Sequence, residues 1–215
     1  MSKPMLSILI PSTPDRHKDL SKLLECISEQ EHTRKVDMFD IGELNCSRYY
    51  DLLCPIEILV FEDAKIMTIG EKRELLYKHA NGKFSWQIDS DDSIAPDAIQ
   101  TILAVIKDNP NIPCITFREN CMMNGEYKSS NHSIKYEKWA DNFDGYDYVR
   151  CPFYKDVIRT DIAQSVPFEY VRYNEDEKFS MAIKPLLTDE AHIDREIYFY
   201  IYEPKDTHEE RYGFD

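Results

Sequence analysis

Phe84-Ser85-Trp86-Gln87-Ile88-Asp89-Ser90-Asp91-Asp92 joins an apolar-rich run to three carboxylates within four positions. Carboxylates this close repel one another unless a metal ion, an arginine or solvent offsets their charge. Oxygen ligands with no Cys or His nearby suit Mg²⁺ or Mn²⁺ better than Zn²⁺. A solvated acidic turn before a helix fits equally well, because Pro96 follows shortly and Asp is common at helix starts. The stretch alone leaves both interpretations open.

Apolar runs predict four strands in the first half of the chain, at residues 6–11, 56–61, 84–88 and 112–117. Apolar residues at helical spacing follow each of the first three runs. The second of these helices has a capping-box pattern at Thr68 and Glu71, and Asn81-Gly82 is a typical helix end. Strands that alternate with helices predict an α/β fold with a mostly parallel, Rossmann-like sheet flanked by helices.

The second half of the chain is less regular and predicts a mixed structure. Residues 121–136 are expected to form a hairpin with Asn124-Gly125 as its turn. Residues 136–159 are rich in aromatic side chains but have no clean period. A helix is predicted from Asn174, a strand at residues 196–202, and a polar tail from Glu203. The length of 215 residues suits a single domain spanning the chain.

Composition excludes several classes of protein. No apolar run reaches the roughly 20 residues of a membrane span, and the N-terminus has no signal-peptide pattern. The six cysteines stand singly, which predicts a reducing compartment and a cytoplasmic location. The net charge of −14 argues against a broad nucleic-acid-binding face. The chain has neither GxxxxGK[ST] nor GxGxxG, so a P-loop enzyme or a dinucleotide oxidoreductase is not indicated.

Polar residues follow three of the predicted strands. They are Ser12-Thr13, Glu62-Asp63 and the acidic cluster Asp89–Asp91. The carboxyl ends of parallel strands lie at one edge of a sheet, where α/β proteins bind their ligands. Three polar clusters at three strand ends therefore favour a binding site over an incidental acidic turn.

The assembled pattern resembles the family 2 glycosyltransferases of the GT-A fold. The resemblance covers about residues 5–118 closely and about residues 170–210 more loosely. The segments that carry it are Ser7-Ile8-Leu9-Ile10-Pro11-Ser12-Thr13, Val60-Phe61-Glu62-Asp63, Gly70-Glu71-Lys72-Arg73, Asn81-Gly82-Lys83-Phe84 before Ile88-Asp89-Ser90-Asp91-Asp92 and Pro96, and Glu175-Asp176 with Phe179. It divides the domain into a nucleotide-sugar-binding half, residues 1–118, and an acceptor-binding half with a C-terminal tail, residues 119–215.

The resemblance implies inverting transfer of a sugar from a nucleotide sugar, commonly a UDP-sugar, with Mn²⁺ or Mg²⁺. Asp176 would be the catalytic base and Glu175 would bind the acceptor. Asp91, the last acid of the DXD motif, would hold the metal with His208. The nucleotide-sugar-binding residues implied by position are Pro11, Ser12, Thr13, Glu62, Asp63, Arg73, Asp89 and Ser90.

The sequence departs from the family pattern at two places. Glu62-Asp63-Ala64-Lys65 stands where Asp-Asp-Gly-Ser is usual. This departure puts the recognition of the nucleobase of the donor in doubt. The basic motif often found near the C-terminal end is not clear here. Two alternatives remain open: a catalytically silent GT-A-like domain that binds sugar or protein, and a nucleotidyltransferase. Joint retention of Asp89, Asp91, Glu175 and Asp176 disfavours the first alternative.

The acceptor is not specified by the sequence. The chain is similar to stand-alone glycosyltransferases of bacterial or phage origin, some of which modify hydroxymethylated cytosine in DNA. For a phage enzyme the location would be the bacterial host cytoplasm. A glycan, a protein or a small molecule is the alternative acceptor. Basic residues in the second half are candidates for DNA contacts: Lys128, Lys135, Lys138, Arg150, Lys155, Arg159 and Arg172.

Overall fold

The computed structural model describes residues 3–30, 35–41, 44–50, 56–171 and 174–202, with the backbone alone at 35–41 and 44–50. The strands are β1 (Leu6–Ser12), β2 (Lys35–Ile41), β3 (Leu44–Tyr50), β4 (Ile56–Glu62), β5 (Phe84–Gln87), β6 (Ser93–Ile94), β7 (Cys114–Met123), β8 (Glu126–His132), β9 (Ala140–Phe143), β10 (Tyr146–Arg150), β11 (Val157–Arg159) and β12 (Glu190–Tyr202). The helices are η1 (Pro14–Arg16), α1 (His17–Gln30), α2 (Ile69–His79), α3 (Ala98–Asp108), α4 (Thr160–Ala163), α5 (Glu175–Ile183) and η2 (Lys184–Leu186).

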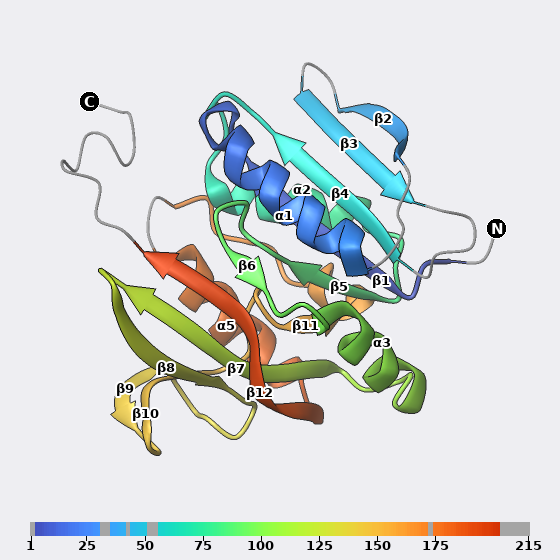
Figure 1. Cartoon of the computed structure of the whole chain (residues 1–215). Helices are drawn as coiled ribbons and strands as arrows, with labels where there is room; N and C mark the ends of the chain where they lie inside the picture. Colours follow the sequence, from blue (N-terminus) through green and yellow to red (C-terminus); the bar gives the residue numbers. More distant parts are fainter. Residues whose placement is uncertain (1–2, 31–34, 42–43, 51–55, 172–173, 203–215) are drawn as a thin grey trace.

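Strand β1 lies near the middle of one continuous mixed sheet (Figure 1). It pairs in parallel with β4 on one side and β5 on the other, so that Leu9 lies beside Leu59 and Gln87. The strand order is β2-β3-β4-β1-β5-β11-β7-β8-β10-β9, and β12 pairs with both β6 and β7. The chain leaves β4 and returns on the other side of β1. This reversal opens a crevice at the carboxyl ends of the parallel strands.

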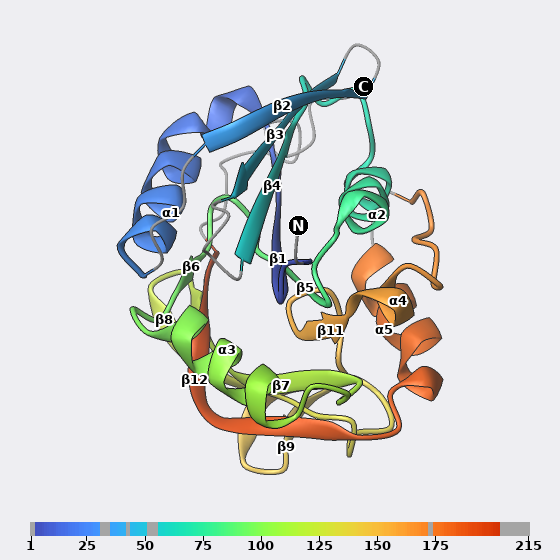
Figure 2. The same cartoon turned by 90° about the vertical axis from the view of Figure 1, so that its right-hand side faces the viewer.

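Helices cover both faces of the parallel part of the sheet (Figure 2). Helices α1 and α3 pack on one face, where Leu23 and Ile102 join the core formed with Ile8. Helices α2 and α5 pack on the other face, where Tyr77 and Phe179 share a core with Leu9 of β1. Adjacent residues of β1 therefore point to opposite apolar layers, as expected for a strand buried on both faces. None of the described helices is long and apolar enough to cross a membrane.

Several local predictions are confirmed. Thr68 and Glu71 form the capping box of α2, with a distance of 2.8 Å between the Thr68 backbone nitrogen and Glu71 Oε2. The hairpin of β7 and β8 turns at Asn124 and Gly125, whose φ angles of 55° and 80° suit a tight turn. The α/β sheet flanked by helices is also as predicted, but it is mixed and not mostly parallel: β4, β1 and β5 form the parallel row, while β3 pairs with β4 in antiparallel fashion.

The strand predicted at residues 112–117 is present as the start of β7, which begins at Cys114. The prediction that it continues the parallel row of β1, β4 and β5 is wrong. Short β11 lies between β5 and β7 and is antiparallel to both. The parallel neighbour of β7 is β12, which begins at Glu190, earlier than predicted. The region without a clean period contains β9, β10 and β11, whose short length gives little periodic signal.

Gly82 allows the turn before β5 to approach β1 closely. A Cβ atom at this position would lie 2.6 Å from the Ser7 nitrogen and 2.8 Å from the Leu6 carbonyl carbon. The Gly82 amide also donates to Ser7 Oγ at 2.8 Å. We expect Gly82→Ala to lower the free energy of unfolding by about 1–3 kcal/mol, because backbone must move to relieve the overlap. Urea unfolding measures this change.

The control is Gly125→Ala at the hairpin turn. A Cβ atom at Gly125 meets nothing within 4 Å, so only the strain of its φ of +80° remains. This strain costs about 1–2 kcal/mol. A Gly82→Ala protein as stable as the wild type would show that the contact with β1 is loose.

Candidate active site

The loops that follow β1, β4 and β5 surround a pocket of about 520 Å³, a size that suits a small-molecule ligand. Pro11, Ser12 and Thr13 line it from the end of β1. The turn Asp89–Asp91 lines it from the end of β5, and Arg73 from α2. The polar strand ends therefore meet at one edge of the sheet, as the sequence predicts. The roles of these residues in ligand binding remain predictions.

Asp89 is held by a buried arginine. Arg73 Nη1 lies 2.8 Å from Asp89 Oδ1 and Arg73 Nη2 lies 3.2 Å from Oδ2. The Tyr154 hydroxyl donates to Asp89 Oδ2 at 2.9 Å, and the guanidinium lies 3.4 Å from the centre of the Tyr154 ring. Burial acts to raise the pKa of Asp89, but the charge and hydrogen bonds of Arg73 outweigh it and lower the pKa. Asp89 is therefore an ionised, fixed group of the pocket wall.

Asp91 forms an ion pair with Arg16 of η1, and both side chains are about one third exposed, at 36%. Burial raises the pKa of Asp91, while the charge of Arg16 opposes the rise. Both residues line the pocket. A partly exposed ion pair contributes little to the free energy of folding. Asp91 can therefore exchange Arg16 for another cation at little cost in free energy.

Asp92 points away from the pocket into the protein. Its Oδ2 accepts a hydrogen bond of 2.6 Å from the Tyr198 hydroxyl and lies 3.7 Å from Lys155 Nζ. Burial raises the pKa of Asp92 to about 7. The three carboxylates of the turn thus have three different cationic partners. Among the described residues, no cluster of three or more His, Cys, Asp or Glu side chains is placed to hold a metal ion.

Two serine hydroxyls in the pocket have no hydrogen-bond partner among the described residues. Ser12 Oγ and Ser90 Oγ are both buried, in residues only 3% and 1% exposed. A buried hydroxyl without a partner costs about 1–3 kcal/mol, so such groups usually await a ligand or water. Because both serines line the same pocket, they indicate that a polar ligand completes the site.

Asp63 does not face the pocket, contrary to the prediction. It is 5% exposed, and its carboxylate forms an ion pair with Lys72. Asp63 Oδ2 also accepts the backbone N–H groups of Ile66 and Met67, at 2.7 Å and 2.9 Å. It therefore shapes the loop after β4. Glu62 is half-buried on β4 and is absent from the pocket lining formed by the described residues.

Glu175 and Asp176 begin helix α5 next to the pocket. Glu175 is 9% exposed, and its Oε1 lies 3.8 Å from Arg73 Nε. Burial raises the pKa of Glu175, and Arg73 opposes the rise. Asp176 is half-buried, and its Oδ1 accepts the N–H of Glu177 at 2.8 Å. Predicted ligand His208 lies outside the described residues.

Several pocket residues were not predicted from the sequence. Tyr200 approaches from β12, and Val171 comes from the segment before α5. Lys65 lines the pocket in a left-handed conformation with a φ of 63°, and its Nζ lies 3.1 Å from Asp15 Oδ2. The position of Arg16, just after the polar end of β1, was an available signal. Tyr200 gave none, since its strand reaches the pocket only through pairing with β6 and β7.

Five of the basic residues proposed for DNA contacts are paired with acidic side chains in the described part of the chain. Lys155 is buried, at 5% exposure, and its Nζ lies 2.6 Å from Glu119 Oε1. This overturns its assignment as a surface contact. Four others have acidic partners, in the pairs Lys128–Asp147, Lys135–Asp144, Arg150–Asp141 and Arg159–Asp161. Lys138 is exposed, and Arg172 lies outside the described residues.

The fold is similar to that of known glycosyltransferase structures. S. aureus TarS 1–349 superposes with a TM-score of 0.62 at 16% identity, covering 91% of this chain and 60% of that one. The same TarS fragment in complex with UDP-GlcNAc gives 0.62 at 14% identity, covering 94% and 59%. The chain thus spans less than two thirds of these relatives. At this identity the likeness establishes the GT-A fold alone.

The sequence itself identifies the family. No curated protein matches the chain in sequence. The model of glycosyl transferase family 2 matches residues 57–171, which is more than half of the 215 residues. This segment contains β4, β5 and the Asp89–Asp92 turn, and therefore most of the pocket. The chain belongs to glycosyl transferase family 2.

Proposed function

We propose that the chain is an inverting glycosyltransferase that moves a sugar from a nucleotide sugar to an acceptor hydroxyl. The observation that carries the proposal is the pocket at the strand ends, where Ser12 and Ser90 present unpartnered hydroxyls beside the fixed carboxylate of Asp89. A ribose or a sugar offers the hydroxyl groups that such a wall binds. The chain belongs to glycosyl transferase family 2, so glycosyl transfer is the reaction that we propose for this pocket.

The donor proposed is a UDP-sugar. TarS, which shares the fold, has been solved with UDP-GlcNAc and with UDP. In the present chain, Pro11 and Thr13 line the part of the pocket that would receive the nucleotide. Arg16, Lys65 and Arg73 bring cationic side chains to the same pocket, each paired with a carboxylate of its lining. The pairs of Arg16 and Lys65 are partly exposed, so we propose that a diphosphate recruits these two cations.

The residues of the pocket fit Mn²⁺ or Mg²⁺ binding through Asp91. These ions commonly bind one or two carboxylates together with the phosphate oxygens of a substrate. The Asp91 carboxylate lies on the pocket wall, and its present partner Arg16 is a partly exposed group that it can exchange. A bound divalent cation would supply positive charge that stabilises the leaving diphosphate. Asp89 is already neutralised by Arg73, so Asp91 is the ligand we propose.

Asp176 is proposed as the base that accepts the proton of the acceptor hydroxyl. Burial raises the pKa of the nearby Tyr154 hydroxyl, Arg73 opposes the rise, and the charges of Asp89 and Asp176 add to it. The carboxylates of Asp176 and Asp89 thus both act on the Tyr154 hydroxyl, which donates to the pocket residue Asp89. Glu175, packed beside Arg73, orients the acceptor side of the site.

We propose a glycan, a protein or a small hydroxyl compound as the acceptor in preference to DNA. The buried position of Lys155 and the acidic partners of Lys128, Lys135, Arg150 and Arg159 reduce the support for a DNA acceptor. Modified DNA remains an arm of any acceptor panel. A catalytically silent binding domain would bind the donor and show no transfer in that panel.

The test of the proposal is the binding of UDP with Mn²⁺, measured by calorimetry. We expect Asp91→Asn to weaken binding about ten- to hundredfold, because a charge-assisted contact worth about 1.5–3 kcal/mol is lost. Chelation of the metal should weaken wild-type binding by a similar factor and should leave the variant unchanged. The control is Asp19→Asn on α1, where the carboxylate contacts Lys22 at the surface. Equal affinities of wild type and Asp91→Asn would reject Asp91 as the ligand.

A further inference from the structure

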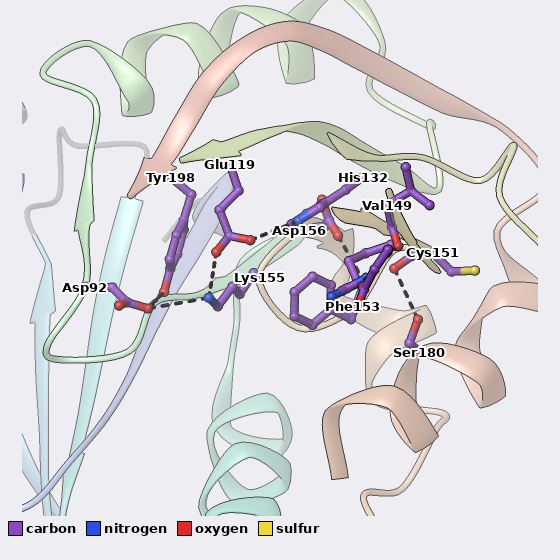
Figure 3. Close-up of polar contacts among 12 residues, drawn as sticks. Asp92, Glu119, His132, Val149, Cys151, Phe153, Lys155, Asp156, Ser180 and Tyr198 are labelled. Carbon is purple, nitrogen blue, oxygen red and sulfur yellow. Dashed lines mark hydrogen bonds and ion pairs between the residues drawn. The ribbon is translucent and has the colours of Figure 1, made fainter. Parts of the chain in front are cut away.

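Five buried ionisable side chains form a line that ends at Asp92, next to the pocket-lining residue Asp91 (Figure 3). Asp156 Oδ1 lies 3.1 Å from His132 Nδ1, and His132 Nε2 lies 3.2 Å from Glu119 Oε2. Glu119 Oε1 accepts a hydrogen bond of 2.6 Å from Lys155 Nζ, which is 3.7 Å from Asp92 Oδ2. Each of these five residues is at most 5% exposed. The line connects the β8 strand to the turn that follows β5.

Acidic and basic side chains alternate along the line. Burial acts to lower the pKa of His132, but Asp156 and Glu119 raise it to about 9, so the imidazole is protonated at neutral pH. Burial acts to raise the pKa of Glu119, but Lys155 and His132 lower it to about 2. Removal of Lys155 leaves the terminal carboxylate of Asp92 buried without its cation and takes one of two cations from Glu119, which is unfavourable.

The line ends on the turn that lines the pocket. The Tyr198 hydroxyl donates to Asp92 Oδ2 and accepts the N–H of Asp89 at 3.1 Å. The carbonyl of Lys155 accepts the indole N–H of Trp86 at 2.7 Å, so the Lys155 backbone is also fixed to β5. The first residue of the turn, Asp89, is bonded to Tyr198, and the last, Asp92, is bonded to both Tyr198 and Lys155. Lys155 Nζ also lies 4.7 Å from the centre of the Tyr198 ring, so it contacts the groups that hold both ends of the turn.

Lys155 also supports a wall of the pocket directly. Its Nζ lies 3.9 Å from the centre of the Tyr200 ring, and Tyr200 lines the pocket. Lys155 itself does not line the pocket, although its neighbour Tyr154 donates to Asp89. An ion pair kept only for stability could be replaced by apolar side chains at little cost. Lys155 contacts one residue of the pocket wall, Tyr200, directly and reaches the wall-forming turn through Asp92, so it has a further use.

We propose that Lys155 is a positioning residue for glycosyl transfer, which holds the Asp89–Asp92 turn and Tyr200 in the geometry that receives the nucleotide sugar. The proposal rests on the proposed function for its second consequence, ligand binding. Its first consequence, the order of the turn, is independent of any ligand. The two consequences are measured separately.

The first measurement is amide hydrogen exchange of the free protein. The variant is Lys155→Met with Glu119→Gln, because Lys155→Met alone leaves Asp92 without a cation and Glu119 with His132 as its one remaining cation, and is prone to unfold. We expect the amides of Asp89 and Asp92 to exchange at least about tenfold faster in the double variant, while amides of the β1–β4 ladder keep their rates. Unchanged exchange at the turn would overturn the proposal.

The matched control is Arg159→Gln, four residues further along the chain. Arg159 is paired with Asp161 at the surface, with a distance of 2.6 Å between Nε and Oδ1. This control removes a cation from the same segment and should leave exchange at both sets of amides unchanged. Faster exchange at the turn in Arg159→Gln would overturn the specific role of Lys155.

The second measurement is titration with UDP and Mn²⁺. We expect the double variant to bind at least about tenfold more weakly than the wild type, although no pocket residue has been replaced. A loosened turn with unchanged affinity would overturn the positioning role. A wild type that fails to bind UDP would instead reject the proposed donor, and exchange at the turn would still decide whether Lys155 orders it.

Discussion

Replacement of Asp176 by Asn is expected to lower the turnover rate about 10²–10⁴-fold, the range attributed to a general base. An acceptor hydroxyl is a poor nucleophile at neutral pH until its proton is removed. Asn keeps the size of the side chain and removes its basicity. The affinity for the nucleotide sugar should change little, because donor binding does not need this group. Steady-state rates and UDP titration on the same variant measure both quantities.

The competing explanation is that Asp176 only favours the start of helix α5. Acidic residues in a first helical turn contribute about 0.3–1 kcal/mol each. Asp176 Oδ1 does accept the N–H of Glu177, so this contribution is present. Glu177→Gln is the matched control, since Glu177 lies in the same turn and is exposed. If Asp176→Asn and Glu177→Gln both melt slightly earlier with full activity, Asp176 is a helix-capping residue and not the base.

The parallel part of the fold could be predicted from the sequence because its signals are local. The apolar run of β1, the capping box of Thr68 and the turn at Asn124 each depend on residues a few positions apart. The carboxyl ends of parallel strands lie at one edge of the sheet, so the polar residues that follow these strands are expected there. For this reason the location of the pocket was predicted more accurately than the contacts within it.

The partners of the acidic turn could not be predicted, because they come from distant segments. The Tyr154 hydroxyl reaches Asp89 across 65 residues of sequence, and Tyr198 reaches Asp92 across 106. Lys155 stands in a region without periodicity and appeared as one basic residue among seven. A single sequence does not show that its charge is used inside the protein. The orientation of Asp63 could not be predicted either, because its carboxylate binds backbone N–H groups of the irregular loop after β4.

Loss of Arg73 should destabilise the protein strongly. It is 3% exposed, binds Asp89 through two nitrogens and lies 3.8 Å from Glu175. Arg73→Met leaves two buried carboxylates without a cation. Removal of one partner from a buried ion pair costs about 3–5 kcal/mol, so we expect a loss of this size in urea unfolding at pH 7. Arg159→Gln at the surface should change stability by less than about 0.5 kcal/mol.

The pH dependence of this loss identifies its cause. Arg73 lowers the pKa of Asp89, so the pair stabilises the folded protein above the ordinary pKa of 3.8, and this stabilisation is lost as the pH falls below it. In Arg73→Met, burial favours protonation of Asp89. The stability difference from wild type should therefore be largest at neutral pH and should shrink as the pH approaches 4. A difference that stays constant with pH would attribute the loss to packing against Tyr154. Arg73→Lys separates charge from geometry, because lysine retains the cation without the two-nitrogen contact to Asp89.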